Sequence, residues 1–407
     1  MEQNVVDEMG GVVYTTHGFV RAERCSFKGN IAGTEGGVIA SEASRVSTPG
    51  EPGEPGAIAG RTRGPCIGRV EIVDCDFYGN KAVHYGGILF SAAGSTIIAH
   101  SLVMDNVGGV EAGVASVRQH GTLTWLSTRF AGNFGRTGAG MVLTDGDMIV
   151  QDSVIDANYA SWGMLYIKDG ESSANISGSL FYNNTAVGGA LLYCELCGNI
   201  WYEDNLARHN LAYKDGGIFY FEDCASELTV LHSVFKANTA ENNGGLIYSV
   251  LSGRYELRRV SILISDSLLE ANAAISNGGV LYIRGGKKLI MSNSTLHGNK
   301  VPHGSSQLAS PYFRCSVLRG GGEGSGSKSD VKKACGQELP LMCQVGKKVM
   351  LGGEPTACCG KEVMLRVVEL TVCCGQGGGV GVVCLRCAAG KEVLSFTYVL
   401  GGKKVMS

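Results

Sequence analysis

The sequence predicts an all-β fold, a right-handed, single-stranded parallel β-helix, from three observations. Glycine is abundant, at 61 of 407 residues, whereas only 8 are proline, which excludes collagen and favours many tight turns. Gly-Gly pairs followed by aliphatic residues recur through residues 1–310, most often six positions after an asparagine. Between these turns lie short, alternating apolar runs such as GGVLYI and LTVLHSVF, which are typical of strands rather than helices. The right hand follows from the usual chirality of parallel crossovers.

The composition excludes several other classes of protein. An apolar content of 44% is too high for a disordered chain. With 35 basic and 37 acidic residues the net charge is −2, so no nucleic-acid partner is expected. No apolar run is long enough for a transmembrane segment, and the first residues, MEQNVVDEMGGVVYTT, lack the basic and apolar regions of a signal peptide.

An asparagine that recurs about every 26 residues from Asn4 onward defines the repeat unit, and eleven copies predict about eleven coils. Two intervals are longer. The first contains a Pro/Gly/Ser-rich insertion, 41–65, expected to form a mobile loop, and the second spans SVLSGRYELRRV. Because asparagine tolerates left-handed geometry and can bond turn amides, its copies are expected to form a ladder at one bend. They are Asn30, Asn80, Asn106, Asn133, Asn158, Asn184, Asn210, Asn238, Asn272 and Asn299.

The other repeated positions indicate the shape of one coil, which we expect to contain three short strands. An apolar residue, usually Phe, Leu or Ile, precedes the asparagine by three positions, and a small Ser, Thr or Cys precedes it by five. Both are predicted to point inward. The Gly-Gly pairs are predicted at a second bend, where a Cβ would clash with the adjacent coil. These structural glycines are Gly36, Gly37, Gly86, Gly87, Gly188, Gly189, Gly216, Gly217, Gly244, Gly245, Gly278 and Gly279.

The combination of F-x-x-N with G-G-[AILV]-[ILV] resembles the repeat of the chlamydial polymorphic outer-membrane proteins, whose signature tetrapeptides are FxxN and GGAI. The matching FxxN segments are 27–30, 77–80, 130–133, 181–184 and 235–238, and the likeness covers about three quarters of the chain. That family carries its repeats on a β-helix at the cell surface, associated with adhesion. Similar repeats occur in large surface proteins of algae and other protists.

This resemblance implies a non-catalytic structural or adhesive β-helix, located extracellularly or at the cell surface. Its partner would be a surface carbohydrate or another cell-surface protein. Because Asn4 already lies within a unit that starts before Met1, we expect the chain to be a fragment of a longer protein.

The alternative function is a polysaccharide-acting or carbohydrate-binding β-helix, which would need converging acidic or basic groups. Its best candidates are Asp145 and Asp147 in TDGD, Glu222 with Asp223, and His209. Asp-Gly-Asp and Glu-Asp beside a strand are more typical of turns, and His209 occupies a turn position otherwise held by Gly, Ala, Asp or Asn. No histidine has a partner at metal-ligand spacing. We therefore predict no catalytic residue, no metal site and no cofactor.

Cysteines supply two candidate disulfides. Cys25 and Cys75 occupy equivalent small-residue positions on neighbouring coils, so they could bridge, although cysteine there more often replaces serine. Cys197 and Cys224 follow their Gly pairs at similar distances and could join adjacent coils. Cys194 completes a lone CxxC with Cys197, for which a redox or zinc role is not expected. Cys66 directly follows the insertion.

The repeat domain is predicted to span 1–312, followed by a Gly/Cys-rich tail, 313–407. Within the tail Gly-Lys-(Lys/Glu)-Val-(Met/Leu) recurs at irregular spacing, and Cys384 and Cys387 form a CxxC. A small disulfide or metal module is one interpretation. Low-complexity sequence without a fixed fold is the interpretation we favour, because little else in the tail could form a core.

Overall fold

The structure is a computed structural model. It describes residues 1–16, 18–42, 68–92, 94–118, 121–138, 141–144, 146–168, 172–224, 226–251, 260–284, 286 and 288–301, together with strands beyond residue 301. For 141–144 and those later strands only the backbone is described. Ala139, Gly140, Asp145 and Cys66 therefore lie outside the description, as does most of the predicted loop at 41–65.

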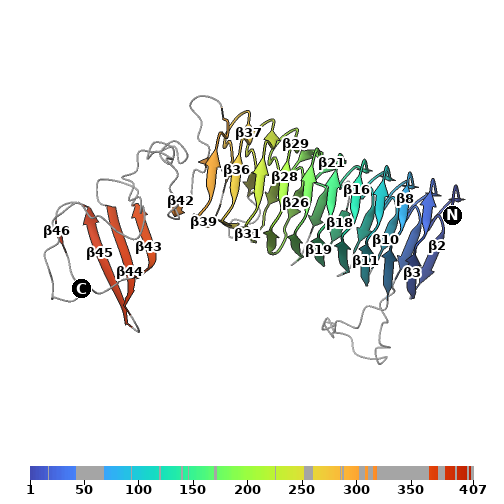
Figure 1. Cartoon of the computed structure of the whole chain (residues 1–407), viewed down its shortest axis with the longest axis horizontal. Coiled ribbons are helices and arrows are strands. Elements are labelled where there is room, and N and C mark those ends of the chain that lie inside the picture. The colour runs from blue at the N-terminus through green and yellow to red at the C-terminus, as the bar shows by residue number, and fades with distance from the viewer. Residues whose placement is uncertain are drawn as a thin grey trace, which may run out of the picture. The chain divides into compact units, whose positions relative to one another are not determined.

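The first of two compact units, Met1–Val349, contains a stack of short parallel strands arranged in four sheets, A to D (Figure 1). In each coil the chain passes from sheet D to A, then B, then C. Sheet D contains β3 (Phe19–Glu23), β7 (Arg69–Val73), β11 (Ser95–Ala99), β15 (Thr122–Leu126), β19 (Asp147–Gln151), β23 (Ser173–Ser177), β27 (Ile200–Glu203), β31 (Glu227–Leu231), β35 (Ser261–Ser265), β39 (Lys288–Ser292) and β42 (Cys315–Leu318). Sheet A contains β4 (Ser26–Lys28), β8 (Asp76–Tyr78), β12 (Leu102–Met104), β16 (Arg129–Ala131), β20 (Val154–Asp156), β24 (Leu180–Tyr182), β28 (Leu206–Arg208), β32 (Val234–Lys236), β36 (Leu268–Glu270) and β40 (Thr295–His297).

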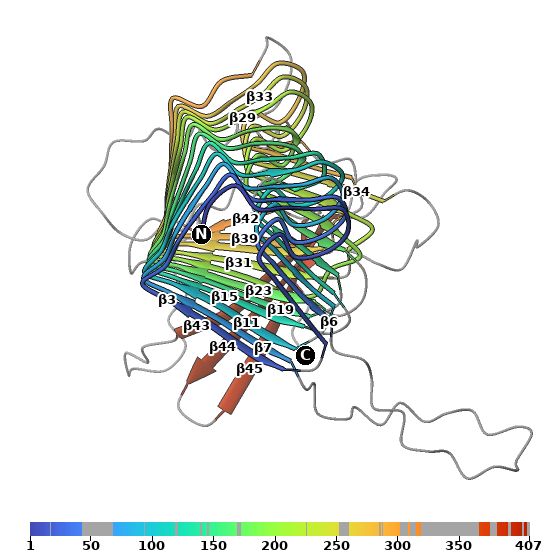
Figure 2. The same ribbon diagram turned by 90° about the vertical axis from the view of Figure 1, so that its right-hand side faces the viewer.

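Sheets B and C complete each coil, and Figure 2 shows the coils lying over one another along the stack. Sheet B contains β1 (Val5–Val6), β5 (Ile31–Ala32), β9 (Lys81–Ala82), β13 (Val107–Gly108), β17 (Phe134–Gly135), β21 (Tyr159–Trp162), β25 (Thr185–Gly188), β29 (Leu211–Ala212), β33 (Thr239–Ala240) and β37 (Ala273–Ala274). Sheet C contains β2 (Val13–Thr16), β6 (Ile39–Glu42), β10 (Leu89–Ser91), β14 (Ala115–Val117), β18 (Met141–Thr144), β22 (Leu165–Lys168), β26 (Leu192–Glu195), β30 (Phe219–Glu222), β34 (Ile247–Val250), β38 (Leu281–Ile283) and β41 (Leu308–Ala309). The predicted all-β parallel solenoid is confirmed. Among the described residues there is no helical segment with the length and hydrophobicity that a membrane crossing requires.

Each coil has four strands, and the prediction of three was wrong. The small Ser, Thr or Cys was expected inside a continuous strand, but the residue before it adopts left-handed backbone geometry and creates a corner between sheets D and A. Asp74, before Cys75, has φ of 52°, and Asp152, before Ser153, has φ of 50°. Residues of many types take this conformation, so no recurring glycine or proline marks the corner in the sequence.

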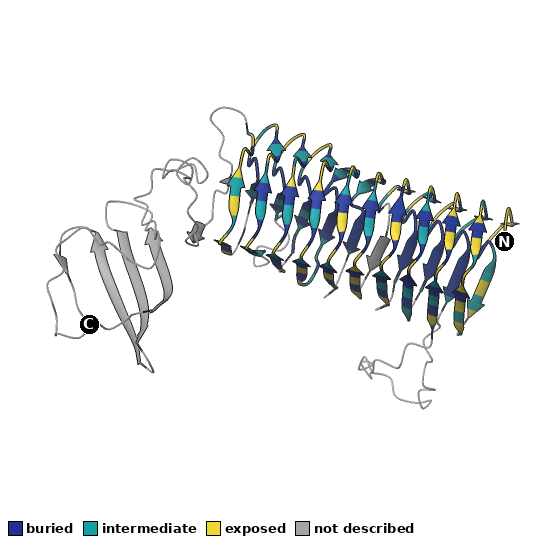
Figure 3. Cartoon of the chain, in the orientation of Figure 1, coloured by how far each residue is buried: buried dark blue, intermediate teal, exposed yellow. Residues whose placement is uncertain are grey.

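Buried positions alternate with more exposed ones along most strands of sheets A, B and D, whereas strands of sheet C such as β10 and β14 are buried at three successive positions (Figure 3). Phe77 and Phe130, each 1% exposed, illustrate the predicted apolar position three before the asparagine. Phe27 and Phe77 stack with ring centroids 4.9 Å apart, which matches the spacing of neighbouring parallel strands. The inward positions of sheet B hold alanine or glycine, such as Ala32 and Ala212, since the coil is narrow there.

The asparagines form an unbroken, buried ladder from Asn30 to Asn299, with Asn4 as its first, exposed member. At each level the backbone N–H and the side-chain Nδ2 donate to Oδ1 of the asparagine in the next coil. For Asn133 and Asn158 these distances are 2.9 and 3.0 Å. The Nδ2 group also reaches a backbone carbonyl, as Asn133 does to Val103 at 3.0 Å. Left-handed geometry belongs to the preceding residue rather than to the ladder asparagine, which corrects our expectation.

The small-residue position forms a second ladder that the sequence did not predict. It runs along the corner between sheets D and A. Here each backbone N–H donates to the side chain of the equivalent residue one coil further, as Thr128 N–H does to Ser153 Oγ at 3.2 Å. The Ser153 hydroxyl in turn donates to the carbonyl of Gln151 at 2.8 Å. The members are Cys25, Cys75, Ser101, Thr128, Ser153, Ser179, Asn205, Ser233, Ser267 and Ser294.

The two glycines of a pair serve different purposes. Gly86 has φ of +61°, and a Cβ there would collide with the carbonyl oxygen of Leu89 in its own coil. For Gly87, a Cβ would collide with the carbonyl of Gly113 in the next coil, which matches the clash that the sequence predicted. Gly188 differs from the other predicted glycines, since its φ is not positive and a Cβ would meet only ordinary contacts.

The tail contributes to both compact units. β42 extends sheet D by pairing with β39, past the predicted domain boundary at residue 312. The second unit, Met350–Ser407, contains an antiparallel sheet of β43 (Arg366–Cys374), β44 (Gly381–Ala389), β45 (Glu392–Leu400) and β46 (Lys403–Lys404). The tail's other residues lie outside the description, so its low-complexity interpretation stays a prediction.

Candidate functional site

The outer side of sheet B, together with the turns that follow its strands, carries exposed apolar side chains, which we call the apolar stripe. Phe134 and Tyr159 pair in register on neighbouring coils, and their parallel rings stack 5.6 Å apart with 40% of each side chain exposed. Soluble proteins rarely leave extended apolar surface uncovered unless it binds something. The stripe consists of Val5, Ile31, Val83, Val110, Phe134, Tyr159, Tyr213 and Ile275.

An open pocket of about 370 Å³ adjoins this stripe and shares Val110 with it. Its walls come from five successive coils, so it is elongated along the stack. Two exposed cations, Arg136 and Lys214, contribute to the lining, which contains no acidic residue. The ring of Trp162 lies 5.0 Å from that of Tyr193, at the edge of sheet C. The lining residues are Val110, Arg136, Thr137, Ser161, Trp162, Val187 and Lys214.

A row of stacked tyrosines follows the outer side of sheet C. Its members pair in register over five coils, with ring centroids 4.5 to 5.5 Å apart. They are Tyr166, Tyr193, Tyr220, Tyr248 and Tyr282. Because the rings cover one another's faces, little aromatic face is left on which a ligand could stack.

The hydroxyls of this row connect successive coils. Tyr166 donates to Glu195 at 2.7 Å, and Tyr193 donates to Glu222. Burial, together with the hydrogen bond to Glu222, raises the pKa of Tyr193. Burial also raises the pKa of Tyr248, to about 12. The tyrosine row therefore contributes to the structure by linking successive coils.

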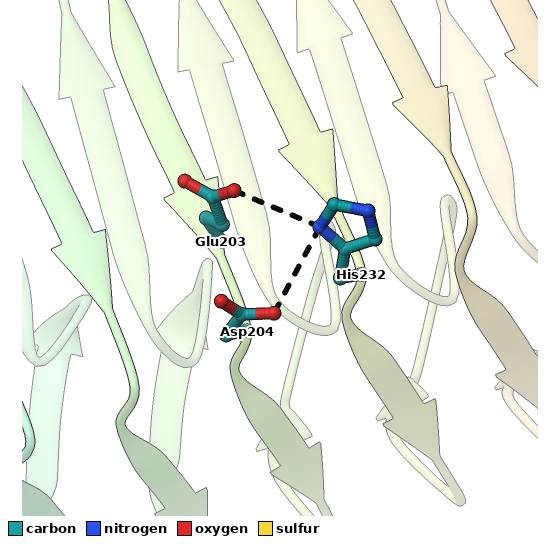
Figure 4. Close-up of side chains that lie close together, drawn as sticks. All are labelled: Glu203, Asp204 and His232. Carbon is teal, nitrogen blue, oxygen red and sulfur yellow. Dashed lines mark ion pairs between the residues drawn. The ribbon is translucent and has the colours of Figure 1, made fainter.

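A cluster of three potential metal ligands, Glu203, Asp204 and His232, lies at the corner between sheets D and A (Figure 4). The Nδ1 of His232 is 3.6 Å from the nearer oxygen of Glu203 and 3.8 Å from that of Asp204. Trp201 Nε1–H donates to the other oxygen of Glu203 at 2.9 Å. Three such donors could hold a divalent cation, but an ion pair with a protonated imidazole satisfies the same geometry. The sequence analysis missed this cluster because its residues come from different coils.

The candidate enzymatic residues are not brought together. Asp147 lies at the start of β19 in sheet D and accepts a hydrogen bond from Ser173. Glu222 ends β30 in sheet C, where it accepts the Tyr193 hydroxyl. Asp223 is a buried corner residue with φ of 52°. His209 has φ of 56°, as expected for a turn residue. No cleft in the described part of the chain unites these groups.

The two cysteine pairs differ. Cys25 and Cys75 each donate to the carbonyl two residues earlier, Glu23 and Val73, at 3.2 Å. Ser153 makes the same bond, so these thiols follow the serine pattern. All five cysteines whose side chains are described are unbridged.

Cys197 and Cys224, by contrast, place their sulfur atoms 3.2 Å apart in the core. Burial raises the pKa of Cys194 and of Cys197. Burial alone would also raise the pKa of Cys224, but hydrogen bonds from the thiols of Cys194 and Cys197 hold it well below its usual value.

Comparison of the chain with protein-family models, with curated proteins and with solved structures found no match.

The apolar stripe was also missed by the sequence analysis, although a pattern for part of it exists. The residue after each ladder asparagine points outward from sheet B, and at several coils it is large and apolar, as in Ile31, Phe134 and Tyr159. An offset of one from the asparagine would have found Val5, Ile31, Phe134 and Tyr159, whereas the other members of the stripe lie three or four positions after it.

Proposed function

We propose that this chain is the rigid, non-catalytic, adhesive region of a longer cell-surface or extracellular protein, and that it binds a partner along the apolar stripe. The apolar stripe carries this proposal, since exposed aromatic and aliphatic side chains recur on the same side from Val5 to Ile275. The two side-chain ladders support the rigidity, because every coil is bonded to the next at the same positions. The location is supported by the resemblance of the repeats to those of surface proteins.

The chemistry of the stripe favours a protein partner over a carbohydrate. Aliphatic side chains such as Val83 and Ile275 offer apolar area but no group that bonds a sugar hydroxyl. Arg136 and Lys214 add positive charge at the adjoining pocket. We infer a partner surface with apolar side chains and at least one carboxylate to meet these cations.

Binding to intact cells tests the proposal. The labelled full chain is compared with a Phe134→Ser/Tyr159→Ser variant on cells left untreated, treated with protease, or treated with periodate to oxidise surface glycans. We expect the double variant and the protease treatment each to reduce binding at least tenfold, whereas periodate leaves it unchanged. The matched control is Ile149→Ser/Leu180→Ser, since both residues are 41% exposed but lie on sheets D and A.

Two results would contradict the proposal. Equal loss in the control variant would show that binding does not depend on the stripe. Loss after periodate but not after protease would point to a carbohydrate partner instead. The enzymatic alternative stays a prediction that no contact among the described residues favours.

A further inference from the structure

We propose that Cys197 and Cys224 are a modification site at which an intercoil disulfide forms in the core of the solenoid. The two residues occupy equivalent positions on successive coils. Each directly follows a left-handed corner residue, Leu196 with φ of 60° and Asp223 with φ of 52°. Leu196 N–H donates to the carbonyl of Glu222 at 3.0 Å, which fixes the alignment of the two corners.

Both side chains point into the core and meet there. Cys197 is 3% exposed and Cys224 is 2% exposed, and their sulfur atoms are 3.2 Å apart. A small rotation of the side chains brings two sulfur atoms at this separation within bonding distance. Because the two residues are 27 positions apart in the sequence, the bond links two coils and does not close a local loop.

The reaction requires a disulfide oxidant, such as oxidised glutathione, and balances as two exchange steps. The Cys224 thiolate attacks one sulfur of the oxidant, forms a mixed disulfide and releases one reduced glutathione. The Cys197 thiolate then attacks the Cys224 sulfur and displaces the second glutathione. Two thiols are oxidised, one glutathione disulfide is reduced, and the two thiol protons end on the released glutathiones. Since both sulfurs are buried in the folded coil, the exchange belongs to folding, before the core closes.

The other described cysteines are poorer candidates. Cys194 points into the same region, and the Cys224 sulfur lies 3.4 Å from the Cys194 carbonyl oxygen. A bond from Cys194 to Cys197 would join residues three apart and would not connect coils. The thiols of Cys25 and Cys75 are directed to their own backbone carbonyls, at 3.2 Å.

Peptide mapping tests the proposal. The full chain is unfolded in reductant, refolded in a glutathione redox buffer, alkylated without reduction and digested with trypsin. Cleavage at Lys168, Arg208, Lys214 and Lys236 places Cys197 in peptide 169–208 and Cys224 in peptide 215–236. We expect one linked species, lighter by two hydrogens than the sum of the two peptides, which separates on reduction. Cys194→Ser should retain the linked species, and Cys197→Ser should lose it.

Stability provides a second readout. A bond that closes this loop in the unfolded chain should raise the urea midpoint of the oxidised protein above that of the reduced protein. That rise should be present in Cys194→Ser and absent in Cys224→Ser. Separately alkylated peptides after refolding would overturn the proposal, as would a bond confined to peptide 169–208. Stoichiometric zinc that protects the three thiols from alkylation would overturn it as well.

Discussion

Both ladders of the solenoid link each coil to the next by hydrogen bonds, but they differ in which residue types they accept. At the bend between sheets A and B every member is asparagine, whereas the corner between sheets D and A accepts Cys, Ser, Thr and Asn. The side chain of an asparagine here makes four hydrogen bonds. Its Oδ1 accepts two N–H groups from the previous coil, and its Nδ2 donates to the next asparagine and to a backbone carbonyl. In the second ladder a side chain accepts one N–H and donates once. The number of hydrogen-bonding roles thus explains why one position is uniform and the other varies.

The largest expected effect is the loss of an asparagine from the middle of its ladder. Asn158→Ala would remove the acceptor of the Asn133 backbone N–H and Nδ2. It would also remove the donor to the Phe130 carbonyl and to Asn184 Oδ1, and all these bonds are buried. We expect the free energy of unfolding to fall by about 4 kcal/mol. Chemical denaturation of the full chain measures it. Asn175→Ala, at an exposed asparagine of sheet D, is the control and should change stability by less than about 0.5 kcal/mol. Similar values for the two variants would refute the special role of the ladder.

The glycine bend extends the comparison, because it requires a residue without a Cβ, whereas the ladders require a side chain that forms hydrogen bonds. Gly86→Ala introduces a Cβ at φ of +61° that collides with the Leu89 carbonyl. We expect a loss of about 3 kcal/mol. Gly188→Ala is the matched control, since its Cβ would have nearest neighbours at 3.4 Å or more, and it should be nearly neutral. A large loss at Gly188 would show that any glycine of a pair is required.

Substitutions in the second ladder should lower the free energy of unfolding less than substitutions in the asparagine ladder. Ser153→Ala orphans the single backbone N–H of Thr128, so we expect a loss of about 1.5 kcal/mol by the same denaturation measurement. Ser153→Cys should recover most of it, because Cys75 already fills an equivalent position and accepts the N–H of Cys25 at 3.4 Å. If Ser153→Ala were as damaging as Asn158→Ala, the count of hydrogen-bonding roles would not explain the difference.

The repeat period revealed the solenoid, its asparagine bend and its glycine bend, because each of these features demands a particular residue. The corner before Ser153 was not predictable in the same way, since Asp74, His100, Ser127 and Asp152 all adopt left-handed geometry there. Tertiary stacking, not residue type, imposes that conformation. The cluster of Glu203, Asp204 and His232 depends on which outward side chains of different coils become neighbours, so it required the strand register. Part of the stripe, by contrast, follows the asparagine in the sequence.

The smallest expected effect concerns pH, and it separates the tyrosine row, whose phenols titrate, from the asparagine and serine positions of the ladders, whose side chains do not. Burial raises the pKa of Tyr248 to about 12, above the value of about 10 in an unfolded chain. The folded state therefore holds the neutral phenol more firmly, and this contribution is fully present below about pH 10 and is lost as pH rises toward 12. We expect the urea midpoint to fall over that window, and to fall less in Tyr248→Phe. Ser153→Ala is the control and should retain the full decline, since a serine hydroxyl does not ionise in this pH range. An equal decline in Tyr248→Phe and the native chain would mean that other groups control alkaline stability.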